Sequence, residues 1–188
     1  MKNLILLTLL SGSYILSYGQ KTKNETDLKS LTKLDLGLQG IGVTFEPRIG
    51  RTLTTEFSAG VGGGYSIGEE SLDYEWQIFN PAFYFSATPK FFYNRQKRIE
   101  KGKSAKLNSG NYIGLRVKYT TGSIDPQPNI RETLLINLHW GLQRSISNRL
   151  SFNTHIGAGY AQDLASQIGT FYPALDFKLS YNFVNPKN

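Results

Sequence analysis

LLINLHWGLQRSISNRLSFNTHIGAGY, residues 134–160, reads as two alternating strands joined by a short polar turn. In the first strand apolar residues such as Leu138 and Trp140 share one face, and His139 and Gly141 share the other. The second strand repeats this alternation. Because successive side chains of a strand point to opposite faces, the period of two separates an apolar surface from a polar, glycine-rich one.

This hairpin predicts an all-β fold, an antiparallel up-and-down transmembrane β-barrel of about eight strands. The chain of 188 residues is 39% hydrophobic, which excludes a bundle of membrane-spanning helices. A barrel needs only alternate residues to be apolar, so this composition is compatible with one. The 19 glycines, 11 tyrosines and 11 phenylalanines fit strands with aromatic girdles better than helices.

The N-terminus has the pattern of an export signal. A cationic start is followed by an apolar run at residues 4–10 and by Ser17-Tyr18-Gly19, a small-x-small cleavage pattern. We therefore predict a signal peptide at residues 1–19 and localisation in the outer membrane. A polar mature N-terminus would then cover residues 20–33, the barrel 34–183 and a short tail 184–188.

Alternation is visible in seven strands, among them residues 34–46, 53–65 and 72–93, whereas bacterial single-chain barrels have an even number. The apolar positions change parity near residues 39–40 and again at 80–81, and we interpret both changes as bulges inside long strands. The missing strand would come from residues 22–32 or 72–79. With a periplasmic C-terminus, the turn at residues 145–148 and the basic insertion at 94–108 are expected in the periplasm.

Two features favour a membrane barrel over a soluble one whose apolar face points inward. Ionisable residues share the face opposite the apolar one, where they can pair inside a narrow barrel: Glu56, Lys90, Arg116, Lys118, Asp176 and Lys178. Tyrosines stand at strand ends, as interfacial girdles require: Tyr65, Tyr93, Tyr119, Tyr160 and Tyr181.

The basic segment also carries a resemblance. Its residues are Tyr93, Asn94, Lys97, Arg98, Lys101 and Gly102, then Asn108-Ser109-Gly110-Asn111, with Pro81 and Pro89 ahead of them. With these residues the chain resembles small outer-membrane β-barrel proteins of the Bacteroidetes type. The resemblance implies the barrel fold and a family mostly without an assigned activity, so no catalytic residue is carried over.

Two groups of residues are candidate sites. His139 and His155 fall on inward faces of neighbouring strands, and a three-residue turn would place them directly opposite each other. With Asp176 they form either an interior polar cluster, which we favour, or a weak divalent-metal site. The second group could contact anionic lipid headgroups or stay solvated: Arg95, Lys97, Arg98, Lys101, Lys103 and Lys106.

The sequence favours a barrel with a filled interior and a structural or surface-interaction role, not an enzyme, with no cofactor. The expected partners are outer-membrane lipid and an unidentified extracellular protein or glycan. Nucleic acid is excluded, despite the net charge of +7, because no platform of interleaved aromatic and basic residues is present. Two alternatives stay open: a lipid-modifying or lipid-hydrolysing enzyme using either histidine, and a secreted lipocalin-like carrier of an apolar ligand.

Overall fold

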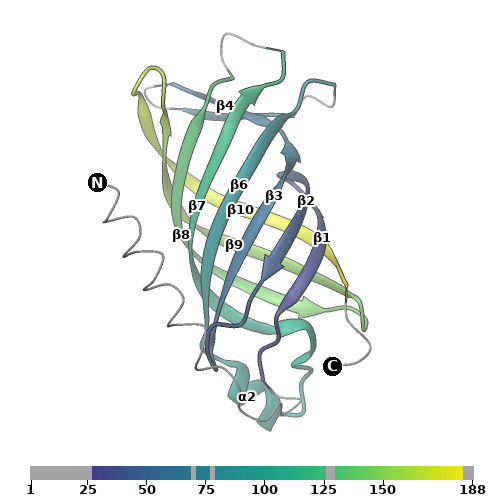
Figure 1. Ribbon diagram of the computed structural model, residues 1–188. Helices are drawn as coiled ribbons and strands as arrows, with labels where there is room; N and C mark the ends of the chain where they lie inside the picture. The colour runs from purple at the N-terminus through teal and green to yellow at the C-terminus, as the bar shows by residue number, and fades with distance from the viewer. Residues whose placement is uncertain (1–26, 69–70, 77–78, 126–129, 184–188) are drawn as a thin grey trace, which may run out of the picture.

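The computed structural model describes residues 27–68, 71–76, 79–125 and 130–183, and eight antiparallel strands form a closed barrel (Figure 1). Each strand pairs with the next barrel strand along the chain, and β1 pairs with β10 to close the ring. The prediction of an eight-stranded, all-β barrel is confirmed. The strands are β1 (Leu31–Gly37), β2 (Gly40–Glu46), β3 (Leu53–Gly62), β6 (Ala82–Phe92), β7 (Gly110–Ser123), β8 (Thr133–Ser145), β9 (Leu150–Asp163) and β10 (Gly169–Asn182).

The missing eighth strand comes from a hairpin within the predicted strand 34–46, whose first strand already begins at Leu31. Residues 22–26 and 77–78 of the two segments considered for it lie outside the described residues, as do the predicted signal peptide at 1–19 and the tail at 184–188. Residues 34–46 divide into β1 and β2, with Leu38 and Gln39 at the tip and Gly37 paired with Gly40. Gly40 has a φ of 119°, which is readily available only to glycine. The predicted bulge near residues 39–40 is therefore wrong: a two-residue tip produces the same change of parity as a bulge.

The predicted strands at residues 53–65 and 72–93 are each broken. β3 ends at Gly62, and a small separate hairpin follows, formed by β4 (Gly64–Ile67) and β5 (Leu72–Glu75). β6 starts only at Ala82, so the parity change at residues 80–81 marks a break between two sheets and not a bulge. Tyr65 consequently lies buried in the mouth of the barrel and not in an outer girdle.

A basic connection covers the opposite end of the barrel, between β6 and β7. It contains the short helix α2 (Arg95–Glu100) and the 3₁₀ turn η2 (Lys106–Asn108), where Leu107 and Asn108 have positive φ. The chain leaves β10 at this same end (Figure 1). Among the described residues, no helix is long and apolar enough to cross a membrane.

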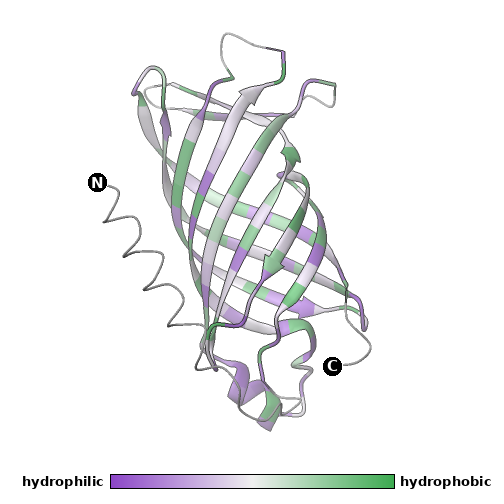
Figure 2. Ribbon diagram, in the orientation of Figure 1, coloured by the Kyte–Doolittle hydropathy of each residue, from purple (hydrophilic) through white to green (hydrophobic). Residues whose placement is uncertain are grey.

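Hydrophilic and hydrophobic residues are interspersed along the barrel strands (Figure 2), and their burial pattern alternates between the two faces of the wall. Every charged side chain of the eight barrel strands except Arg144 lies on the inward face. Large apolar side chains of every barrel strand are exposed on the outside, including Leu36, Val43, Phe57, Phe85, Leu115, Leu138, Ile156 and Leu175. The predicted directions of the apolar and polar faces are thus confirmed for the barrel strands.

Candidate functional site

The centre of the barrel is a network of ion pairs built around Glu56 of β3. Its carboxylate, 1% exposed, accepts hydrogen bonds from the ammonium groups of Lys33, Lys90 and Lys178, with Lys33 Nζ at 3.3 Å. Lys178 also donates to Asp35 Oδ2 at 2.8 Å. Because a buried charge is costly unless it is paired and hydrogen-bonded, these contacts make the filled lumen tolerable.

A second group of contacts ties this network to the end that carries α2 and η2. Glu46 pairs with Lys33 at 2.5 Å and accepts hydrogen bonds from Thr54 at 2.9 Å and from the Asn108 amide at 3.2 Å. Gln143 donates to the Leu107 carbonyl at 2.9 Å. Side chains inside the barrel therefore hold η2 against this end.

His139 and His155 are brought together, but in a register other than the predicted one. Ser145 pairs with Ser151, so His139 lies opposite Gly157 and His155 opposite Gly141. The shift of two residues keeps both side chains on the inward face, as any even shift must. The two imidazole rings stack diagonally, with centroids 3.9 Å apart and an interplanar angle of 23°.

Glycines create the room for these rings. A Cβ at Gly114 would lie 2.5 Å from His139 Nε2, and one at Gly157 would lie 2.7 Å from His139 Cβ. His139 Nδ1 is hydrogen-bonded to Asn137 at 2.7 Å, while His139 Nε2 and His155 Nδ1 have no hydrogen-bond partner in the described part of the chain.

Asp176 lies beside the histidines, but its carboxylate is hydrogen-bonded to another residue. Its backbone is paired with His155, yet its carboxylate accepts a hydrogen bond from Arg116 at 3.0 Å. No group of three or more His, Cys, Asp or Glu side chains in the described part of the chain could hold a metal ion. The geometry is that of an interior polar cluster in which the carboxylate is already held by a guanidinium.

The predicted headgroup-binding residues divide into one buried and several accessible members. Arg95 is buried and donates to the carbonyls of Ala105 and Ser109 at 3.1 and 3.2 Å. Burial lowers the pKa of Arg95 to about 10 from its ordinary value of 12.5. Arg95 therefore holds the connection together and cannot face a lipid headgroup. Arg98 is half-buried, and the remaining members are exposed: Lys97, Lys101, Lys103 and Lys106.

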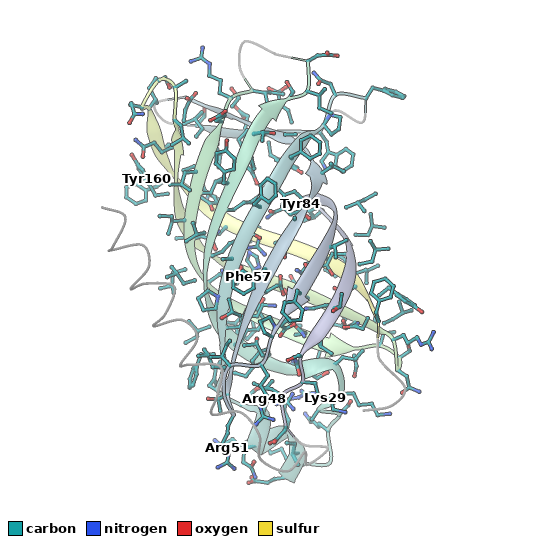
Figure 3. The ribbon with its side chains drawn as sticks, in the orientation of Figure 1. Lys29, Arg48, Arg51, Phe57, Tyr84 and Tyr160 are labelled. Carbon is teal, nitrogen blue, oxygen red and sulfur yellow. The ribbon has the colours of Figure 1, made fainter. Side chains whose placement is uncertain are left out.

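Cations from other segments of the chain lie near the exposed lysines of this connection. Lys29, Arg48 and Arg51 lie at the same end of the barrel (Figure 3), and Arg149 belongs to the turn between β8 and β9. The sequence prediction found only the insertion, because these residues are scattered along the chain and are gathered only by the up-and-down topology.

The opposite mouth is covered by the β4–β5 hairpin. Tyr65 packs in a buried cluster with Leu135 and Ala161 of the barrel wall, and the rings of Tyr65 and Tyr74 lie 5.1 Å apart. Burial raises the pKa of both tyrosine hydroxyls above their ordinary value of 10. The hairpin thus lies across the lumen and packs against its wall.

Sequence reasoning missed part of the network. Lys33 was assigned to the polar N-terminus, and Asp35 and Glu46 were not singled out. A usable signal was present, since both Lys33 and Asp35 alternate with the outward Leu34 and Leu36 of β1. Comparisons with protein families, curated proteins and solved structures found no match to this chain.

Proposed function

We propose that this chain is a small outer-membrane β-barrel whose filled interior serves structure and surface interaction instead of solute passage. The observation that carries the proposal is the belt of exposed apolar side chains on every barrel strand. Soluble monomers rarely expose contiguous apolar patches larger than roughly 300–600 Å². A bilayer is the solvent in which such a belt is favourable, and the resemblance to Bacteroidetes-type barrel proteins points the same way.

The interior argues against the two alternatives raised by the sequence. An apolar ligand would meet the ammonium groups of Lys33, Lys90 and Lys178 and their carboxylate partners, so a lipocalin-like carrier role is disfavoured. His139 and His155 are 2% and 4% exposed and lie inside the wall. Neither ring lies on the outer surface of the barrel, and no observation favours lipid hydrolysis.

Cell fractionation with heat-modifiable gel migration tests the location. The full chain should be recovered in outer membranes, and its migration should change on boiling as the barrel unfolds. Recovery of a soluble protein without a heat-dependent shift would contradict the proposal.

A pair of substitutions on β8 tests contact with lipid directly. Leu138→Arg, near the middle of the strand, should lower the free energy of unfolding in lipid vesicles by about 2–4 kcal/mol. Leu134→Arg, at the end of the same strand, should cost about 0–1 kcal/mol, because the penalty falls toward the interface. Equal small costs at both positions would show that the belt does not lie in a bilayer.

A second part of the proposal concerns the basic end of the barrel. Several cations are accessible there: Lys29, Arg51, Lys101, Lys103 and Arg149. Among the described acids at this end, Glu46 is buried in the lumen, and Asp27 and Glu100 are the accessible ones. Asp27 is already paired with Arg48 at 2.9 Å. We propose that these cations bind anionic phospholipid headgroups on the periplasmic side, each contributing about 1 kcal/mol.

The test compares the stability of the barrel in phosphatidylcholine vesicles with and without phosphatidylglycerol. Lys101→Gln/Lys103→Gln should remove about 2 kcal/mol of any stabilisation by phosphatidylglycerol. Arg131→Gln, which removes a cation at the opposite mouth, is the control and should leave that stabilisation unchanged. A wild-type protein indifferent to phosphatidylglycerol would refute the headgroup contact.

A further inference from the structure

The wall of the barrel has a notch at the mouth, on the side where β1 meets β10. β1 ends at Gly37, paired with Lys178, and Leu38 N donates to the Phe177 carbonyl at 3.0 Å. Among the described residues, the upper part of β10, from Gly169 to Asp176, therefore pairs only with β9. The β4–β5 hairpin lies beside this edge, with the Trp76 indole that follows it donating to the Leu38 carbonyl at 3.2 Å.

A cavity of about 200 Å³ lies between this notch and the hairpin. Its polar lining comes from the barrel interior and includes Arg116, Lys118 and His155. Its other walls are largely aromatic and apolar, with Tyr65 and Tyr74 from the hairpin. An apolar cavity of about 150 Å³ can hold a benzene ring, so this volume is room for a compact organic molecule.

Lys118 is the lysine in the cavity lining. Its ammonium group, 2% exposed, donates to Gln39 Oε1 at 2.6 Å and to the Tyr65 hydroxyl at 3.1 Å, and it lies 4.9 Å from the ring centroids of Tyr65 and Tyr84. Among the described residues, no carboxylate lies within 4.0 Å of Lys118. It differs in this from Lys33, Lys90 and Lys178, each of which contacts Glu56.

Two further polar atoms of the lining residues are unsatisfied. Arg116 Nη1 donates to Asp176, but its buried Nε has no hydrogen-bond partner among the described residues. The same holds for His155 Nδ1, which is also buried. An unpartnered buried donor is costly, and a buried cation is usually matched by an anion, so both features point to a missing anionic group.

The opening of the cavity is apolar. Leu38 and Leu175, which line its edge, are 59% and 58% exposed on the outer surface beside the notch. A molecule in the cavity would thus meet cations at one end and apolar or aromatic side chains around its body.

We propose that this cavity binds a small carboxylate that carries a compact apolar body, with the carboxylate on Lys118 and near Arg116. The barrel wall and the β4–β5 hairpin form this cavity, so the proposed binding does not depend on the location of the protein in a membrane. A neutral amide of the same shape would leave Lys118 without an anion, so charge should decide recognition.

Calorimetric titration of the folded, full-length protein with sodium benzoate tests this site. Benzoate should bind at least tenfold more tightly than benzamide, which has the same ring and no charge. Lys118→Met removes the cation and keeps most of the stem, and should weaken benzoate binding at least tenfold. Lys106→Met, the same substitution on the exposed basic end, should have no effect.

A second variant tests the cavity without altering any charge. Ala174 also lines it, and Ala174→Leu should fill part of the space and weaken benzoate binding while heat-modifiable migration shows a folded barrel. The proposal is overturned if benzoate does not bind, if benzamide binds equally well, or if both variants bind like the wild type. Tighter binding of inorganic phosphate than of benzoate would also overturn it, because the apolar walls would then play no part.

Discussion

Glu56→Gln should be strongly destabilising, although the two side chains have nearly the same shape. The substitution removes the carboxylate that Lys33, Lys90 and Lys178 share, while all three ammonium groups remain buried. Lys33 then keeps Glu46 and Lys178 keeps Asp35, whereas Lys90 keeps a hydrogen bond to Gln143 Oε1 at 3.2 Å and, among the described residues, no carboxylate within 4.0 Å. Breaking a buried ion pair from one side typically costs about 3–5 kcal/mol, since an uncompensated charge stays behind.

Urea unfolding of the barrel in lipid vesicles, followed by the loss of its heat-modifiable band, measures this cost. With a urea dependence of about 2 kcal/mol per molar, the midpoint should fall by about 1.5–2.5 M. Glu100→Gln is the control, because Glu100 is exposed on α2 and its described side-chain contact is with Gln96. The midpoint of this variant should not change measurably.

A double substitution separates charge balance from shape. Glu56→Gln/Lys90→Met removes one cation along with the anion, so it should be more stable than Glu56→Gln alone by about 1 kcal/mol or more. A single variant within about 0.5 kcal/mol of wild type would refute the reasoning. So would a double variant less stable than the single one, because the lysines would then be stabilised by something other than Glu56.

Two further predictions follow from the packing of the wall and of the mouth. Gly157→Ala should cost about 1–3 kcal/mol, because its Cβ would lie 2.1 Å from the Leu138 carbonyl oxygen, while Gly50→Ala, 3.8 Å from Leu53, should be neutral in the same urea assay. Burial raises the pKa of Tyr65 above its ordinary value of 10, so above pH 10 its hydroxyl ionises in the unfolded state but stays neutral in the folded state. The stability contributed by Tyr65 is therefore present below pH 10 and is lost as pH rises beyond it. The urea midpoint should therefore fall between about pH 9 and pH 11, and less so in Tyr65→Phe.

The sequence pattern determined which side chains face inward, but it did not determine where the chain reverses. A bulge and a two-residue hairpin tip both change the parity of apolar positions, so residues 39–40 and 80–81 looked alike. Gly40 with its positive φ distinguishes the hairpin, and a separate sheet distinguishes the break before β6. Both depend on which strands pair, and the alternation of one strand carries no information about that.

The alternation also did not predict which side chains pair inside the barrel. His139 and His155 meet although the predicted register was wrong by two residues, because an even shift keeps both on the inward face and the lumen is narrow. Asp176 was expected beside them and lies there, but Arg116, two strands beyond β9 in the ring, takes its carboxylate. The alternation along each strand determines which charged side chains face the lumen. Which of them form ion pairs depends on contacts across the lumen, and these exist only in the closed barrel.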